Sequence, residues 1–254
     1  MTAAPDPLDF SGKRAIVTAG AGAIGAAVVE LLCERGADVL ATDLDEATLA
    51  PLVAGGADVL ACDLTTAEGR SELVERAGGC DHLVLAHGIV RTKPIEETTE
   101  DDWDAIMNVN AKANYFLCKA FGPLLRDGGS IVVVSSVSAR SAASLEQSVY
   151  CASKAAASSI TRSFAHAYAP RGIRVNAVLP GIVDSPMQDR FLAAAAKARG
   201  MTPQEVHETR LRTVPLRRSM SPRECAETVV WLLSPAAAYL TGQQVANDGG
   251  MTMY

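Results

Sequence analysis

The chain has 254 residues, of which 48% are hydrophobic and 20% are charged, and its formal net charge is −6. These values are typical of a folded globular protein and exclude a disordered chain. The acidic balance lacks the basic face that nucleic-acid binding requires, so we expect no nucleic-acid partner.

Cysteine usage and the apolar runs indicate the compartment. The cysteines at positions 33, 62, 80, 118, 151 and 225 form no C-x-x-C pair, so we expect no metal site and no disulfide framework. Residues 1–10 lack the basic and apolar regions of a signal peptide, and no apolar run reaches the ~18 residues of a membrane span. We therefore expect a cytoplasmic protein with no membrane partner.

Short apolar runs alternate with helical patterns along the chain. Strands are expected at 14–18, 38–42, 58–62, 82–86, 130–134, 173–177 and around 243–246. Helices are expected up to about 34 and at about 45–53, 67–77, 101–125, 149–168 and 221–233. Strands without polar alternation are typical of a parallel sheet covered on both faces. The pattern predicts a single α/β domain over residues 1–254, a Rossmann-like doubly wound sheet of about seven parallel strands with helices on both faces.

A basic segment from about 185 to 218 interrupts this alternation after the sixth strand. Its position is at the carboxyl edge of the predicted sheet, where ligands bind in such folds. Two interpretations stay open: a substrate lid, or a solvated helix pair or subunit contact.

A glycine-rich turn follows the first strand. Gly20, Gly22 and Gly25 satisfy G-x-G-x-x-G between a strand and a helix, which predicts a dinucleotide pyrophosphate at the helix N-terminus. Asp43 ends the second strand, where a carboxylate binds ribose hydroxyls and repels a 2′-phosphate. We therefore predict NAD rather than NADP as the cofactor. The alternative for Asp43 is a helix N-cap.

Tyr150 and Lys154 are four residues apart in a helical pattern and share one face. An ammonium beside a phenol is expected to lower the pKa of the tyrosine towards neutrality. Ser135 and Ser136 end the fifth strand at the same sheet edge, where a hydroxyl is suited to donate to a carbonyl or alkoxide oxygen.

Taken together, these motifs resemble the short-chain dehydrogenase/reductase family over essentially the whole chain. The segments that carry the resemblance are 18–25, 63–64, 108–110, 135–136, 150–154, 180–187 and 247–250. It implies hydride transfer between a nicotinamide cofactor and a small-molecule secondary alcohol or ketone, usually in a homotetramer.

The resemblance also implies roles for individual residues. Tyr150 is the implied acid/base, Lys154 its activator, Ser136 the substrate-orienting serine, and Asn110 the holder of a water in the proton relay. Asp63 is implied to contact the adenine, and residues 182–185 to bracket the nicotinamide carboxamide. The implied cofactor contacts are Thr18, Gly20, Gly22, Ile24, Gly25, Asp43, Asp63, Leu64, Ala86, Gly88, Tyr150, Lys154, Pro180, Gly181, Val183 and Ser185.

Three departures from the family pattern matter. Ala19 and Ala23 stand where the family has motif glycines. The family's N-N-A-G reads Leu-Ala-His-Gly at 85–88, which brings His87 near the expected nicotinamide pocket, either as a substrate residue or as a packed histidine. Ser136 lies one residue further from Tyr150 than is usual, so Ser138 is the alternative serine.

We expect substrate contacts from His87, Ser138 and Gln147. The sequence predicts an NAD-dependent enzyme that interconverts a secondary alcohol and a ketone. A biosynthetic ketone reductase and a non-catalytic dinucleotide-binding regulator remain the alternatives. Because a binding module needs no general base, the intact Tyr150 and Lys154 argue against the regulator.

Overall fold

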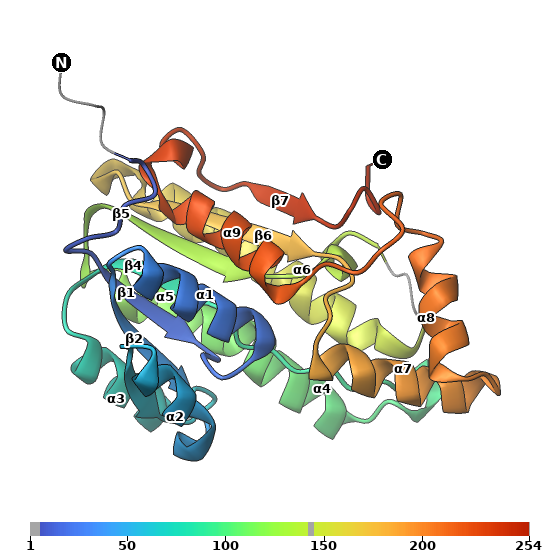
Figure 1. Ribbon diagram of the computed structural model, residues 1–254. Coiled ribbons are helices and arrows are strands. Elements are labelled where there is room, and N and C mark those ends of the chain that lie inside the picture. Colours follow the sequence, from blue (N-terminus) through green and yellow to red (C-terminus); the bar gives the residue numbers. More distant parts are fainter. Residues whose placement is uncertain (1–5, 142–144, 254) are drawn as a thin grey trace.

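A seven-stranded parallel sheet in the order β3-β2-β1-β4-β5-β6-β7 forms the centre of the molecule (Figure 1). The computed structural model describes residues 6–141 and 145–253. Residues 1–5, which belong to the 1–10 segment that we predicted not to be a signal peptide, lie outside the described residues. The strands are β1 Arg14–Thr18, β2 Asp38–Asp43, β3 Asp58–Ala61, β4 Cys80–Leu85, β5 Leu125–Val134, β6 Arg174–Pro180 and β7 Gln244–Asn247. The predicted fold class is confirmed.

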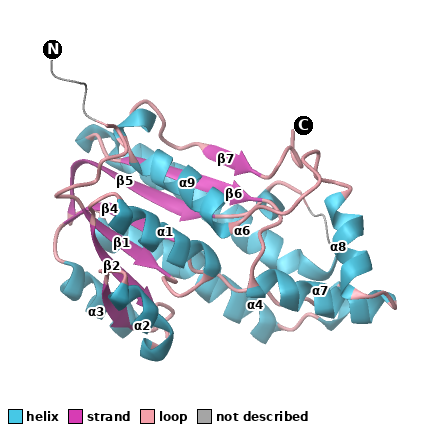
Figure 2. Cartoon of the chain, in the orientation of Figure 1, coloured by secondary structure: helices cyan, strands magenta, loops and turns pink. Residues whose placement is uncertain are grey.

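Helices cover both faces of the sheet, as Figure 2 shows. One face packs against α1 Ala23–Glu34, α2 Glu46–Ala54 and α9 Pro222–Leu233. The other packs against α3 Ala67–Ala77, α5 Ala113–Phe121 and α6 Ser148–Tyr168. The helix expected over 101–125 is instead α4 Glu100–Met107, a π-helical turn at Asn108–Lys112, and α5. β5 begins at Leu125, the last residue of the expected helix and five residues before the predicted start of that strand.

The strands read as continuous apolar runs because both of their faces are buried. In β1, Ala15 and Val17 pack into the core cluster beneath α1 and α9, whereas Ile16 packs into the cluster on the opposite face. Burying an aliphatic side chain of this size stabilises the fold by about 1.5–3 kcal/mol. A polar substitution at any of these positions is therefore costly whichever face it points to.

The segment after β6 forms two helices, α7 Pro186–Arg199 and α8 Pro203–Leu211. Ser185 caps α7 and Thr202 caps α8, and between them Gly200 takes the left-handed conformation that ends α7. Phe191, Leu192 and Val206 join the two helices in a small apolar cluster of their own. The strands β5, β6 and β7 point towards the end of the molecule where α7 and α8 lie (Figure 2).

No helix in the described ranges combines the length and the apolar content that a membrane crossing needs. Within those ranges, no three histidine, cysteine or acidic side chains converge in a way that would hold a metal ion.

Candidate active site

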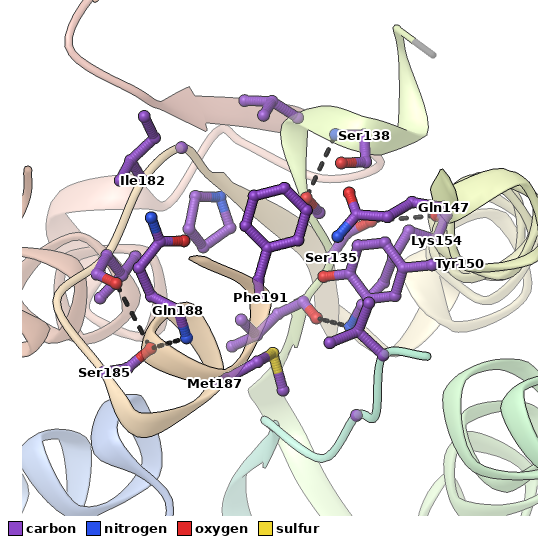
Figure 3. Close-up of a pocket in the computed structure, with 18 of the residues that line it drawn as sticks. Ser135, Ser138, Gln147, Tyr150, Lys154, Ile182, Ser185, Met187, Gln188 and Phe191 are labelled. Carbon is purple, nitrogen blue, oxygen red and sulfur yellow. Dashed lines mark hydrogen bonds between the residues drawn. The ribbon is translucent and has the colours of Figure 1, made fainter. Parts of the chain in front are cut away.

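A pocket of about 250 Å³ opens at the carboxyl ends of β4, β5 and β6 and is walled by α6, α7 and α8 (Figure 3). The predicted site residues that line it are Ile24, Ala86, Gly88, Ser136, Ser138, Gln147, Tyr150, Lys154, Pro180, Gly181, Val183 and Ser185. Residues that are far apart in the chain therefore meet at one sheet edge. This convergence is what parallel strands with a doubly wound topology predict.

Tyr150 and Lys154 project from the first turns of α6 into this pocket (Figure 3). The Nζ atom of Lys154 lies 5.8 Å from the centre of the Tyr150 ring and donates a hydrogen bond to the carbonyl oxygen of Val134 at 2.9 Å. Burial lowers the pKa of Lys154 to about 8. The lysine is thus still mainly charged at neutral pH.

The expected lowering of the Tyr150 pKa is wrong for this structure. Burial raises the pKa of the Tyr150 phenol, and a hydrogen bond with the Ser136 hydroxyl opposes that rise only in part. The Lys154 ammonium donates to the Val134 carbonyl, and desolvation of a phenolate is the largest cause of the shift of the Tyr150 pKa. In the structure as it stands, the phenol is protonated.

The structure separates the two candidate serines. The Oγ atom of Ser136 accepts a hydrogen bond from the backbone N–H of Ser138 at 3.1 Å and pairs with Tyr150. The side chain of Ser138 lines the pocket but pairs with the thiol of Cys151. Ser136 is therefore the serine that the fold brings to the tyrosine.

Asn110 is fully buried in the π-helical turn, and its side chain does not line the pocket. Its amide donates to the carbonyl oxygen of Ile89 and to the Oγ of Ser153, both at 2.9 Å, and its Oδ1 accepts from the N–H of Ile89 at 2.8 Å. The Asn110 carbonyl oxygen accepts from Asn114 at 2.6 Å. The side chain therefore joins the loop after β4 to α6.

Of the two alternatives for His87, the structure favours the packed histidine, and a contact with substrate stays a prediction. Its Nδ1 atom lies 2.8 Å from the Oγ1 of Thr18, and the residue is 6% exposed and does not line the pocket. Burial, aided by the charge of Lys154, lowers the pKa of His87 to about 3, so the ring is neutral. Thr18 also accepts from the N–H of Ala86 at 3.0 Å, which gives it a structural role between β1 and β4.

The glycine turn has no space for side chains. A Cβ atom on Gly25 would lie 2.0 Å from the carbonyl oxygen of Ala19, and one on Gly20 would lie 2.8 Å from the Cβ of Ala41. Ala19 itself has φ of 50°, a left-handed conformation that costs an L-residue about 1–2 kcal/mol. Gly22 is the N-cap residue of α1 and has no side chain to cap it, so the helix N-terminus is free to receive an anion. This turn fits the diphosphate of a dinucleotide.

Asp43 faces the same turn from the end of β2. Its carboxylate accepts hydrogen bonds from the N–H of Ala21 at 3.1 Å and of Leu44 at 2.8 Å. The N-cap interpretation of Asp43 is wrong, because Asp45 caps α2 instead. Asp63, at the end of the neighbouring β3, accepts from both the N–H and the hydroxyl of Thr65. Leu64, predicted beside it as a cofactor contact, is buried in the core.

Sequence reasoning missed individual residues of the pocket wall that α7 and α8 supply. Gln188, Phe191, Arg199 and Arg210 line the pocket, as do Thr213 and Met251. The basic composition of the 185–218 segment was the available signal, yet it did not distinguish the arginines that face inwards. The segment forms two helices on one side of the pocket, and the substrate lid and the subunit contact both stay predictions.

Known proteins resemble this chain over nearly all of its length. The sequence pattern of the family described as enoyl-(acyl carrier protein) reductase matches residues 19–252. The 3-oxoacyl-(acyl-carrier-protein) reductase FabG of Thermotoga maritima is 34% identical, and the alignment covers 96% of this chain and 99% of that protein. A solved structure described as a short-chain dehydrogenase/reductase from Brucella melitensis is 31% identical, with a TM-score of 0.86 over 97% of this chain and 99% of that one.

A second solved structure, a blue fluorescent protein from a metagenomic library in complex with NADPH, is 30% identical, with a TM-score of 0.84 over 96% of this chain and 99% of that one. The parallel sheet, the glycine turn and the grouping of Ser136, Tyr150 and Lys154 agree with these matches. The chain belongs to the short-chain dehydrogenase/reductase family of oxidoreductases.

Proposed function

We propose that this protein interconverts a secondary alcohol and a ketone with NAD as its cofactor and Tyr150 as general acid and base. The observation that carries the proposal is the grouping of the Ser136 hydroxyl, the Tyr150 phenol and the Lys154 ammonium on one pocket wall. The nicotinamide ring of a bound dinucleotide supplies the hydride for ketone reduction and accepts it in alcohol oxidation.

The residues of this wall move the proton that accompanies the hydride. In reduction, Ser136 donates a hydrogen bond to the substrate oxygen while Tyr150 gives its phenolic proton to that oxygen. In oxidation, Tyr150 takes the proton from the alcohol. Lys154 places a positive charge near the phenolate that is left after reduction, which stabilises it. A water on the Asn110 carbonyl is the proposed route by which the proton is exchanged with solvent.

The cofactor preference rests on the charges near the end of β2. Asp43, Asp45 and Glu46 lie within four positions of one another, and Asp43 faces the glycine turn. Negative charge there favours the free ribose hydroxyls of NAD over the 2′-phosphate of NADP. The relative in complex with NADPH makes NADP the alternative.

The second candidate function is ketone reduction as the physiological direction of this reaction, and one observation on Tyr150 favours it. The raised pKa of Tyr150 keeps the phenol protonated, which is the form that donates to a ketone. The similarity to a 3-oxoacyl reductase points in the same direction. We further propose that the protein is cytoplasmic, from its cysteine usage, and homotetrameric, from the family resemblance.

The decisive experiment compares Tyr150→Phe with Tyr168→Phe on the same helix. Wild-type protein is assayed with NAD and NADP against a panel of secondary alcohols and ketones by absorbance of the reduced cofactor. We expect Tyr150→Phe to lower kcat by about 10²–10⁴-fold. Tyr168 donates to the Cys118 carbonyl, remote from the pocket, so its variant should stay within about threefold of wild type.

Full turnover by Tyr150→Phe would contradict the acid/base role. If the wild type bound a dinucleotide but turned over no alcohol or ketone, the non-catalytic regulator would be the better interpretation.

A further inference from the structure

The pocket of this protein has a strongly one-sided charge. Among the described residues that line it, Lys154, Arg199 and Arg210 are cationic and none is a carboxylate. Two of the three cations come from α7 and α8, the helices that form the outer wall.

Arg199 already has a partner within the chain. Its Nη2 atom lies 3.3 Å from both carboxylate oxygens of Glu146, at the rim of the pocket. This ion pair leaves little net charge at that position. The positive charge that remains on the wall belongs to Arg210.

Arg210 is half-buried without a counter-ion in the described part of the chain. Its guanidinium stacks on the Phe191 ring, with Cζ 4.3 Å from the ring centre, and Nη1 donates to the Oε1 of Gln188 at 2.8 Å. Burial and the nearby charge of Arg199 lower the pKa of Arg210 to about 10. A half-buried guanidinium without a carboxylate beside it is suited to bind an anionic ligand.

Gln188 supplies a second donor beside Arg210. Its Oε1 accepts from Arg210, while its amide nitrogen is buried and has no hydrogen-bond partner. In Figure 3 the Phe191 ring stands between Gln188 and Tyr150. The pocket therefore has an apolar surface between a polar group at Gln188 and a polar group at Tyr150. The wall thus offers one net positive charge and an unsatisfied amide N–H, which together match a singly charged planar anion.

We propose that the substrate is a hydroxy acid or keto acid whose carboxylate is bound by Arg210 and Gln188. This inference rests on the proposed function, because it places the carbinol or carbonyl of the same molecule at Tyr150. Arg210 fixes the orientation of the substrate and its affinity, and Tyr150 carries the proton transfer.

The test compares charged substrates with their neutral isosteres. Lactate, 3-hydroxybutyrate and 4-hydroxypentanoate, each with its methyl ester, place the carboxylate at three distances from the alcohol, and glycerol 3-phosphate tests a phosphate instead. We expect the acid of at least one pair to exceed its ester in kcat/KM by about 30-fold or more. In Arg210→Met that advantage should disappear while turnover of the ester persists, and Arg210→Lys should restore part of it.

Arg212→Met is the matched control, since Arg212 is exposed at the end of the same helix and does not line the pocket. It should keep the wild-type ratio of acid to ester. A second readout is independent of turnover: saturation-transfer NMR should detect butyrate binding to wild type and to Arg212→Met but not to Arg210→Met.

Several outcomes would overturn the carboxylate site while leaving the oxidoreductase function intact. These are esters turned over as well as acids, glycerol 3-phosphate preferred to every acid, equal loss of acid and ester turnover in Arg210→Met, or a change confined to the KM for NAD. Butyrate binding unchanged in Arg210→Met would also contradict it. Turnover of a neutral secondary alcohol without turnover of any acid would contradict it as well, whereas failure of the whole panel of alcohols and ketones in the wild type would count against the proposed function.

Discussion

The ammonium of Lys154 and the phenol of Tyr150 share one face of α6, with Nζ 5.8 Å from the centre of the tyrosine ring. Lys154 is buried and Tyr150 is half-buried, and desolvation shifts each towards its neutral form: the pKa of Tyr150 is raised and the pKa of Lys154 is lowered to about 8. The phenolate of Tyr150 and the ammonium of Lys154, the charged forms that the reaction uses, therefore lower the free energy of unfolding. Active sites commonly show such a conflict between stability and activity.

Lys154→Met should remove activity yet stabilise the protein without cofactor. The pKa of Lys154 is about 8 when folded and near 10.4 when unfolded, a penalty of at most about 3 kcal/mol at pH 7. Loss of the hydrogen bond to Val134 offsets about 1 kcal/mol of this. We expect the free energy of unfolding in urea to rise by about 1–2 kcal/mol at pH 7.

The sign of the pH dependence follows from the lowered pKa. Between pH 8 and pH 10.4 the unfolded chain binds more protons at Lys154 than the folded chain does, so wild-type stability rises there relative to the variant. The gain from Lys154→Met should shrink across that window. A gain that grew with pH would show that the lysine is stabilised, not penalised, by its surroundings.

Ser136→Ala should lower kcat by about 10²-fold or more, because it removes a donor aimed at the substrate oxygen. Ser138→Ala should keep kcat within about threefold, since the Ser138 side chain pairs with Cys151 instead. Steady-state kinetics on one alcohol and its ketone measure both effects. The opposite ranking of the two variants would transfer the substrate-orienting role to Ser138.

Asp43→Asn should change the choice of cofactor. The amide keeps the size of the side chain and removes the negative charge that faces the glycine turn. We expect the ratio of kcat/KM for NADP to that for NAD to rise by about tenfold or more. Wild-type protein that already prefers NADP would show that Asp43 does not govern the preference.

Ala19→Gly should stabilise the glycine turn. The left-handed φ of 50° costs alanine about 1–2 kcal/mol, and the greater freedom of glycine in the unfolded chain offsets about 0.4–1 kcal/mol. A net gain of about 0.5–1 kcal/mol is expected, which a thermal melt detects as a rise in Tm of about 1–4 °C. Ala23→Gly is the control, because Ala23 starts α1 with helical backbone and should lose stability.

Local pattern was enough to predict most of the fold. The predicted first strand coincides with β1, and the predicted 67–77 helix coincides with α3, since apolar periodicity and Gly breaks act over a few residues. Local pattern failed at 101–125 for two reasons. The helix there is interrupted by a π-helical turn, and β5 starts early because Leu125 pairs with Cys80 of β4. The pairing of β5 with a strand far away in the sequence cannot be predicted from the residues of β5 alone.

What the sequence by itself determined is the set of chemical groups at the sheet edge: the glycine turn, Asp43, Ser136, and the Tyr150–Lys154 pair at helical spacing. Only the tertiary structure decided how those groups are charged and what faces them. It desolvated Tyr150 and thereby reversed the expected shift of the tyrosine pKa, it turned His87 towards Thr18, and it aimed Arg210 into the pocket. The physical reason is that spacing along a helix is a local property, whereas desolvation and the pairing of charges depend on segments far apart in the chain.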